Sequence, residues 1–275
     1  HDSVGEFRDL AISPDGKWLT YSRTAENEFN IVYVYNLASK KEYPVTDKWY
    51  NSDSPVFSTD GKYLLFTSAR DFNPTYGSTE WNHVYNNMSG VYMALLSKDT
   101  PSPFLEKDDE VAAKKEVTVT VTDVKSGKKS DKAVDKGVDK GVDKSVDKAA
   151  QAVKFDADGI IDRIIRLPIP GGYYGNIYSD GKKVYYWGRG ATQVYDLEKQ
   201  KEDVVADGAR MFVENGSKKA LFLKNNMVYV TDIPSGKIEL KEAVNTSNMK
   251  VTTDYAKEWA QIYNEGWRHM RDGFY

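Results

Sequence analysis

Short apolar runs that flank an Asp-Gly pair are the main pattern in this chain. In the clearest copy, Pro55–Phe57 and Tyr63–Phe66 lie on either side of Asp60 and Gly61. Such a pair between two apolar runs is a strong local signal for a β-hairpin, because Gly takes a positive φ without steric cost and Asp tolerates one. We therefore predict two antiparallel strands here, joined by a primed turn with positive φ at both central residues.

The same pattern occurs in three further places along the chain. Gly16 lies 45 residues before Gly61, and later copies surround Gly181 and, more weakly, Gly216. Each hairpin is followed by a third and then a fourth apolar run. The candidate third strands are Ile31–Leu37, Val91–Leu96, Gln193–Leu197 and Met227–Ile233, and the candidate fourth strands are Glu42–Val45, Ile160–Leu167, Glu202–Val205 and Lys237–Leu240.

Four strands per unit at this spacing are typical of propeller blades. The predicted fold is therefore all-β: a β-propeller of about four four-stranded blades, which includes a partial or open propeller. The simpler alternative is one antiparallel sheet whose hairpins resemble each other by chance.

The periodicity changes from Thr253 to the last residue. Apolar residues now recur at steps of three and four, which predicts one face of an α-helix capped by Thr253 or Asp254. We expect this helix to dock against another domain through its large side chains, which are Trp259, Tyr263, Trp267, Met270 and Phe274.

A charged insertion interrupts the second unit at about residues 105–152. Its residues 131–148 contain a four-residue repeat, Val-Asp-Lys followed by Gly or Ser, with only one apolar residue in four. Such a segment cannot bury enough surface to offset its ordering entropy, so we expect it to be disordered. The insertion is either a tether or interaction tail, or a solvated segment without a specific role. Its composition favours the second alternative.

The loop Asp71–Gly90 is long for a connection between paired strands, and loops of this length are usually functional or disordered. It is rich in aromatic residues, which indicates an ordered loop. The loop either contacts a ligand at the rim or packs as a plug under its blade, and the second is the simpler alternative. The candidate residues for contact with a substrate or partner are Phe72, Tyr76, Trp81, His83 and Tyr85.

Composition narrows the function classes. The formal net charge of the 275 residues is -3, so we expect no nucleic-acid partner. No stretch has the roughly 18 apolar residues that a membrane span needs. There is no Cys, which excludes disulfides and thiolate chemistry and leaves the redox compartment open.

The sequence contains no complete set of catalytic or metal-binding residues. The histidines are His1, His83 and His269, and the Gly-x-Ser-x-Gly elbow, the phosphate-binding glycine loop and the His-Glu-x-x-His motif are all missing. Acidic residues are too plentiful for any pair to stand out as a glycosidase couple. We expect no catalytic residue, no metal and no cofactor in this chain.

Several segments resemble known families. The turn Ser13–Lys17 and its copies resemble TolB-type and tricorn-type propeller blades. Longer segments resemble bacterial tricorn protease homologs, which are serine peptidases of the S41 type. These segments are Asp71–Tyr76, Thr79–His83, Lys98–Phe104, Gly159–Pro170, Glu258–Arg268 and Arg271–Tyr275.

The resemblance implies a modular peptidase with two propellers, a helical segment, a PDZ domain and a catalytic domain. Residues 1–250 would be the last blades of the second propeller, with four apparent blades against the family's seven. Residues 251–275 would open a truncated catalytic domain. None of the family's catalytic Ser, His or Glu positions exists in this chain, and His269 does not match the catalytic His.

The function implied by the resemblance is that of a non-catalytic propeller segment that channels or filters peptides toward a catalytic domain. The expected partners are peptides or unfolded polypeptide and the missing PDZ and catalytic domains, with a homo-oligomer left open. The expected location is the cytoplasm, or the periplasm after removal of a signal peptide. The alternative is a stand-alone TolB-like propeller that binds a protein, and an independent hydrolase with a carboxylate site has no supporting feature.

Overall fold

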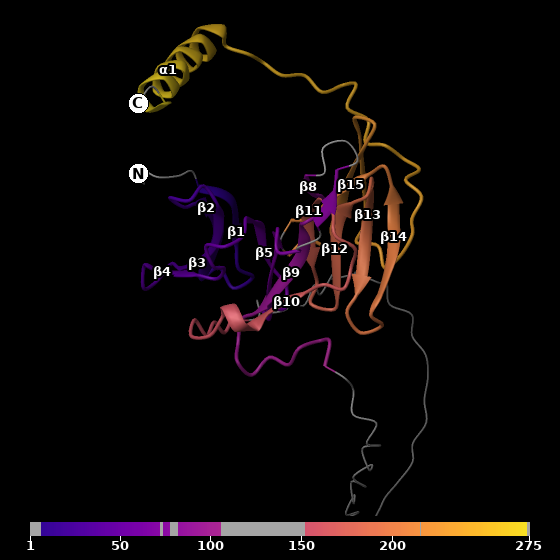
Figure 1. Cartoon of the computed structure of the whole chain (residues 1–275). Coiled ribbons are helices and arrows are strands. Elements are labelled where there is room, and N and C mark those ends of the chain that lie inside the picture. Colours follow the sequence, from indigo (N-terminus) through magenta and orange to yellow (C-terminus); the bar gives the residue numbers. More distant parts are fainter. Residues whose placement is uncertain (1–6, 72–73, 78–81, 106–151, 215, 274–275) are drawn as a thin grey trace, which may run out of the picture.

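Four antiparallel sheets follow one another along the chain (Figure 1). The computed structural model describes residues 7–71, 74–77, 82–105, 152–214 and 216–273. The innermost strands of successive sheets contact each other in order, and the first and fourth sheets lie at the two ends of the arc. This arrangement, with one C-terminal helix, confirms the predicted all-β propeller fold.

The first two sheets each contain four strands. The first has the order β1-β2-β3-β4, formed by β1 (Phe7–Ile12), β2 (Trp18–Thr24), β3 (Asn30–Asn36) and β4 (Lys41–Pro44). The second has the order β10-β9-β6-β5, formed by β5 (Ser52–Phe57), β6 (Tyr63–Ser68), β9 (Gly90–Leu95) and β10 (Ile164–Arg166). A separate two-stranded hairpin, β7 (Pro74–Tyr76) and β8 (His83–Tyr85), connects β6 to β9.

The third sheet is complete and the fourth has three strands in the described residues. The third contains β11 (Tyr174–Ser179), β12 (Lys183–Gly188), β13 (Ala191–Asp196) and β14 (Lys201–Asp207). The fourth contains β15 (Arg210–Phe212), β16 (Lys219–Lys224) and β17 (Met227–Asp232). The helix α1 covers Tyr255–Gly273, and a short 3-10 turn, η1, covers Ile161–Arg163.

The candidate fourth strand Lys237–Leu240 is wrong. This segment has no strand structure, and the backbone N–H of Ile238 donates to the carbonyl of Val205 in the third sheet. Further along, Val244 donates to the carbonyl of Val228 in β17. The segment therefore runs along both sheets instead of completing a ladder with one of them.

The turn between the first two strands of a sheet is closed by its own side chains. In the first sheet, the Ser13 hydroxyl donates to Asp15 Oδ1 at 2.6 Å and accepts the Trp18 N–H at 3.0 Å. Only Gly16 has a positive φ, of 67°, and its N–H donates to the carbonyl of Ser13 at 2.9 Å. The second sheet repeats this geometry with Ser58, Asp60, Gly61 and Tyr63.

This geometry corrects the predicted turn type. In a type I turn with a glycine bulge, the N–H of the Gly bonds to the carbonyl three residues back, and only the Gly has a positive φ. A primed hairpin turn of type I′ needs two residues at positive φ. Neither Asp15 nor Asp60 has a positive φ, and each accepts a hydrogen bond from the Ser hydroxyl two residues before it. The Asp-Gly pair thus predicted the hairpin correctly and the turn type wrongly.

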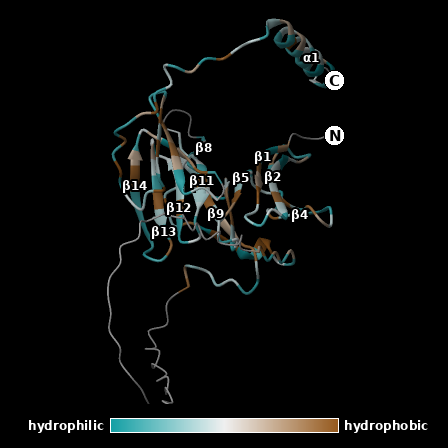
Figure 2. Ribbon diagram, turned by 180° about the vertical axis from the view of Figure 1, so that it is seen from behind, coloured by the Kyte–Doolittle hydropathy of each residue, from teal (hydrophilic) through white to brown (hydrophobic). Residues whose placement is uncertain are grey.

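Hydrophobic clusters fill the space between adjacent sheets. Consecutive residues of β6 point to opposite sides: Leu64 and Phe66 pack against the first sheet, and Tyr63 and Leu65 against the third. A third cluster around Phe222 lies between the third and fourth sheets. Figure 2 shows the hydrophobic residues along the strands. The core is therefore a series of layers between sheets.

The sheets have two different ends, called here the upper and the lower end. Strand register places Ser52, Ser68 and Gly90 side by side at the upper end, where the β7–β8 hairpin arises. The Ser-Asp-Gly turns lie at the lower end. The segments on either side of the insertion also lie at the lower end. The first begins where β9 ends at Leu95, and the second leads into β10 at Ile164, which pairs with Ala94.

We expect Ser58→Ala to lower the free energy of unfolding by about 1–3 kcal/mol, because it leaves the buried Tyr63 N–H without its acceptor and removes the donor to Asp60. Chemical denaturation monitored by circular dichroism measures this change. Ser39→Ala, in an exposed turn, is the matched control and should change stability by about 0.5 kcal/mol or less. Equal effects of the two substitutions would show that the turn network does not stabilise the fold.

Candidate functional site

The β7–β8 hairpin projects from the upper end of the second sheet. Tyr76 pairs with His83 and Pro74 with Tyr85, and the Thr75 hydroxyl donates to the carbonyl of Val84 at 3.1 Å. Side chains alternate along a strand, so Tyr76 and Tyr85 lie on one face of the hairpin. They are 72% and 52% exposed.

The structure therefore brings two of the candidate contact residues together and gives a third a defined backbone position. His83 lies in β8 opposite Tyr76. Phe72 and Trp81 lie outside the described residues. In the described part of the loop, the tyrosines are exposed and do not form a plug under the blade.

The start of the hairpin is held by Asp71. Its Oδ1 accepts the Tyr92 hydroxyl at 2.7 Å, and its Oδ2 accepts Nε and Nη2 of Arg166 at 3.1 and 2.6 Å. Burial raises the pKa of Tyr92, and the hydrogen bond to Asp71 raises it further, so the phenol stays protonated and donating at neutral pH. The Asp71 N–H also donates to the carbonyl of Met88, at the other end of the loop.

The end of the hairpin is held by the connection from β10 to β11. The N–H of Gly172 donates to the carbonyl of Ser89 at 2.8 Å. A Cβ on Gly171 would lie 2.2 Å from the backbone oxygen of Asn87. Only glycine can therefore occupy this position without moving one of the two backbones.

Arg70 connects the hairpin to the first sheet. Its guanidinium lies 5.5 Å from the ring centre of Tyr50 and 5.8 Å from that of Tyr92. Its Nε donates to the Ser68 hydroxyl at 3.1 Å, and its Nη2 lies 3.6 Å from Asp47 Oδ2. The connections of three successive sheets are thus linked at the upper end.

Sequence reasoning did not find Arg70, Asp71 or Arg166. Asp71 and Arg166 are 95 positions apart. The only local signal was an Arg-Asp pair directly after an apolar strand, at the start of an unusually long loop.

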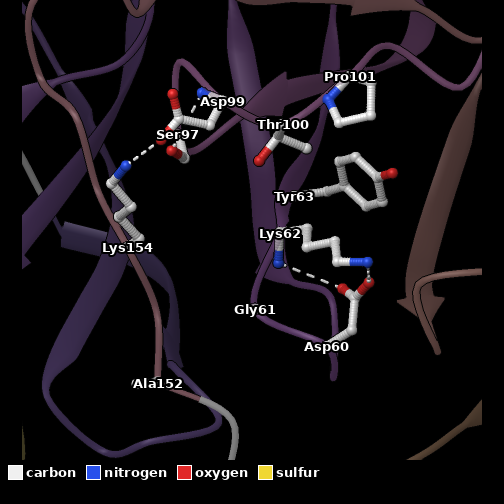
Figure 3. A pocket seen from close by; sticks show the side chains of 10 residues that line it. All are labelled: Asp60, Gly61, Lys62, Tyr63, Ser97, Asp99, Thr100, Pro101, Ala152 and Lys154. Carbon is white, nitrogen blue, oxygen red and sulfur yellow. Dashed lines mark hydrogen bonds and ion pairs between the residues drawn. The ribbon is translucent and has the colours of Figure 1, made fainter.

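A second feature, at the lower end, is a cleft of about 310 Å³ (Figure 3). It lies between the turn of the second sheet and the two segments that flank the insertion. Its charged side chains are paired: Lys62 with Asp60 at 3.7 Å, and Lys154 with Asp99. Figure 3 shows Lys62 and Asp60 on one side of the cleft and Lys154 with Ser97 and Asp99 on the other. The lining contains no histidine that could activate Ser97 or Thr100 as a nucleophile.

No group of three or more His, Asp or Glu residues could hold a metal ion in the described ranges. His269 lies on α1, exposed, beside charged neighbours such as Arg268 and Asp272. In the same part of the chain, no helix is long and apolar enough to cross a membrane.

The predicted C-terminal helix is confirmed as α1. Its cap is Asp254, whose Oδ1 accepts the N–H of Ala256 at 3.2 Å and whose carbonyl accepts that of Glu258 at 2.9 Å. None of its residues is buried. The exposed large side chains are Tyr255, Trp259, Ile262, Tyr263, Trp267 and Met270, and Phe274 lies outside the described residues.

Residues 1–233 match the family model described as the tricorn protease second beta propeller domain. The chain is 25% identical to "Putative Tricorn-like protease C-terminal subunit" of Sulfurisphaera tokodaii, over 95% of this chain and 28% of that protein. It is also 25% identical to "Tricorn protease homolog 1" of Streptomyces coelicolor, over 98% of this chain and 26% of that protein.

A crystal structure of the tricorn protease has the same fold, with a TM-score of 0.66 and 17% identity over 96% of this chain and 24% of that chain. The chain thus spans only about a quarter of the length of these relatives.

We expect Asp71→Ala to loosen the hairpin without unfolding the sheets, since Tyr92 and Arg166 lose their shared acceptor. Charge-assisted hydrogen bonds of this kind are worth about 1.5–3 kcal/mol each, so amide exchange in β7 and β8 should accelerate about tenfold or more. Hydrogen exchange with mass spectrometry measures this. Asp203→Ala, which removes an exposed ion pair with Lys201, is the control. Unchanged exchange in β7 and β8 would mean that Asp71 does not hold the hairpin.

Proposed function

The chain belongs to the family of the tricorn protease second beta propeller domain, and from this premise we propose that it is a non-catalytic propeller segment of a tricorn-like serine peptidase. It guides or filters peptides toward a catalytic domain outside this chain. The observation that carries this proposal is the exposed β7–β8 hairpin, which is fixed at both of its ends at the upper end of the propeller.

The position of the C-terminal segment supports the same proposal. The chain leaves the sheets at the upper end, where Val244 bonds to Val228 next to the start of β17, and it continues into α1 (Figure 1). The hairpin and the exit toward α1 thus share one end of the propeller. A peptide held at the hairpin therefore lies on the side where a domain docked to α1 would receive it.

The proposed partners are peptides or unfolded polypeptide at the hairpin, and the PDZ and catalytic domains of a longer chain at α1. The aromatic stripe of α1 is suited to docking because aromatic side chains bury much area at little cost in side-chain entropy. We further propose a cytoplasmic location, with the periplasm as the alternative.

We expect the purified chain to bind labelled peptides and to hydrolyse none of them. Fluorescence anisotropy measures the binding, and a fluorogenic peptide substrate reports hydrolysis. The double variant Tyr76→Ser/Tyr85→Ser should weaken binding about tenfold, since each lost aromatic contact is worth about 0.5–1.5 kcal/mol. Turnover that disappears in His269→Ala would contradict the non-catalytic assignment, and the absence of peptide binding would contradict the guiding role.

The docking role of α1 predicts a separable effect. Trp259→Ser/Tyr263→Ser should weaken association with a catalytic fragment of a relative by at least about tenfold, while peptide binding stays unchanged. Pull-down and calorimetric titration measure the association. Lys257→Ser/Glu258→Ser, on the same helical turn, is the control and should have little effect. If the control and the aromatic variant behave alike, the stripe is not the docking surface.

A further inference from the structure

Each of the first two lower turns contains an Asp that uses one carboxylate oxygen inside the turn. Asp15 Oδ1 accepts the hydroxyl of the Ser two residues before it and the N–H of the Lys two residues after it. Asp60 Oδ1 accepts the same two groups in the second turn, at 2.6 and 3.2 Å. A carboxylate accepts through both of its oxygens, so Oδ2 of each Asp is left for a partner outside the turn.

In the first turn, the backbone of another stretch of the chain is that partner. The Val153 N–H, from the segment after the insertion, donates to Asp15 Oδ2 at 3.0 Å. The Val153 side chain is buried in the cluster between the first and second sheets. Two residues further on, the ring centre of Phe155 lies 5.1 Å from that of Trp18. This stretch is therefore held on the lower end by one backbone hydrogen bond and two apolar side chains.

In the second turn, Asp60 has no such partner within the part of the chain that the structure describes. No hydrogen bond reaches its Oδ2, and its ion-pair partner, Lys62 Nζ, is 3.7 Å away. The turn of the third sheet approaches from the other side, where a Cβ on Gly181 would lie 2.3 Å from Oδ2. Because this residue is glycine, no side chain covers the oxygen from there.

Trp18 and Tyr63 occupy equivalent positions after the two turns. The N–H of each donates at 3.0 Å to the Ser hydroxyl of its own turn, and each side chain packs toward the next sheet. In the first sheet, Phe155 packs on Trp18. In the second, Tyr63 and Asp60 both line the lower cleft of about 310 Å³ (Figure 3). The cleft thus contains the equivalents of the two groups that hold the stretch after the insertion.

The lower end of the third sheet also carries a stretch of the chain. The carbonyl of Pro234 accepts the Tyr185 hydroxyl at 2.8 Å, and that of Ser235 accepts Lys183 Nζ at 2.9 Å. In the described residues, the sheets on either side of the second therefore each form hydrogen bonds to a stretch of backbone at this end. The second sheet has the cleft there, and its volume is within the range of ligand sites.

We propose that the lower cleft binds a short polypeptide segment of a partner. A backbone N–H of the segment donates to Asp60 Oδ2, and the large apolar side chain two residues later packs beside Tyr63. The chain itself shows this mode of recognition on the first sheet, with Val153 and Phe155 as the bound residues. The site lies at the end of the sheets opposite the β7–β8 hairpin, so it goes beyond the proposed function and does not depend on it.

The test uses the full 275-residue chain and a fluorescein-labelled peptide with the sequence of residues 152–156, Ala-Val-Lys-Phe-Asp. Fluorescence anisotropy measures its binding. Methylation of the Val nitrogen removes the donor and should weaken binding about tenfold or more, because a hydrogen bond to a charged group is lost. Asp60→Asn should weaken binding of the unmethylated peptide by a similar factor. Its carbonyl oxygen still accepts the bonds within the turn, whereas an amide donor replaces Oδ2. In this variant, methylation should have no further effect, since the two changes remove the same hydrogen bond.

Asp180→Asn is the matched control, because it makes the same change in the turn of the third sheet, away from the cleft, and it should leave binding unchanged. Thermal unfolding checks that both variants keep the fold, and the methylated peptide tests the wild-type chain itself. If the two peptides bind equally well, if Asp60→Asn binds as the wild type does, or if the unmethylated peptide does not bind, the cleft proposal is wrong. Loss of binding in Tyr76→Ser/Tyr85→Ser would place the peptide at the hairpin and would also overturn it, while the proposed function would stand.

Discussion

The sheets of this chain have two apolar faces, and this constraint determines how they assemble. In β6 the four consecutive residues Tyr63–Phe66 are buried, so neither face of that sheet can be turned to water. A sheet of this kind needs a neighbour on each side, and radial stacking supplies one. In β16, Ala220 and Phe222 are buried against the third sheet, whereas Leu221 and Leu223 on the other face are 38% exposed. That face shows what the same alternation looks like without a covering sheet.

Face-to-face packing fixes the faces of the sheets, so only the turns and connections at the two ends can vary. The two ends contain different kinds of connection. At the lower end, Ser and Asp side chains satisfy the turn within itself, and Asp15 has one oxygen left to accept the Val153 N–H from the segment after the insertion. At the upper end, the connections vary in length. Arg70 reaches Tyr50 in the connection from the first sheet, and Asp71 binds Arg166 of β10 within the second sheet. A repeated, self-contained turn supports the fold, whereas linked and unequal loops can carry recognition.

The sequence predicted what depends on local pattern. Repeated Asp-Gly pairs predicted the hairpins and the number of sheets, and the 3.6-residue period predicted α1. It could not predict what depends on competition at long range: Ile238 pairs with Val205 of another sheet, and Asp71 finds its partner in Arg166. The predicted turn type was wrong for a different reason: Asp tolerates a positive φ but does not require one, and Asp15 keeps a negative φ while it accepts the Ser13 hydroxyl.

The propeller and α1 differ in how their apolar residues are covered. The sheets bury their own apolar residues, whereas none of the 19 residues of α1 is buried. Most of the stability of a helix in a protein comes from packing of its apolar face, and Gly266 costs about 1 kcal/mol relative to Ala. The hydrogen bonds at Asp254 supply only part of the free energy that is needed to keep the helix folded. Burial of Trp259 and Trp267 against the partner domain that we propose would supply the rest. In the proposed function, docking therefore belongs to α1, and the propeller is left free to present its upper end.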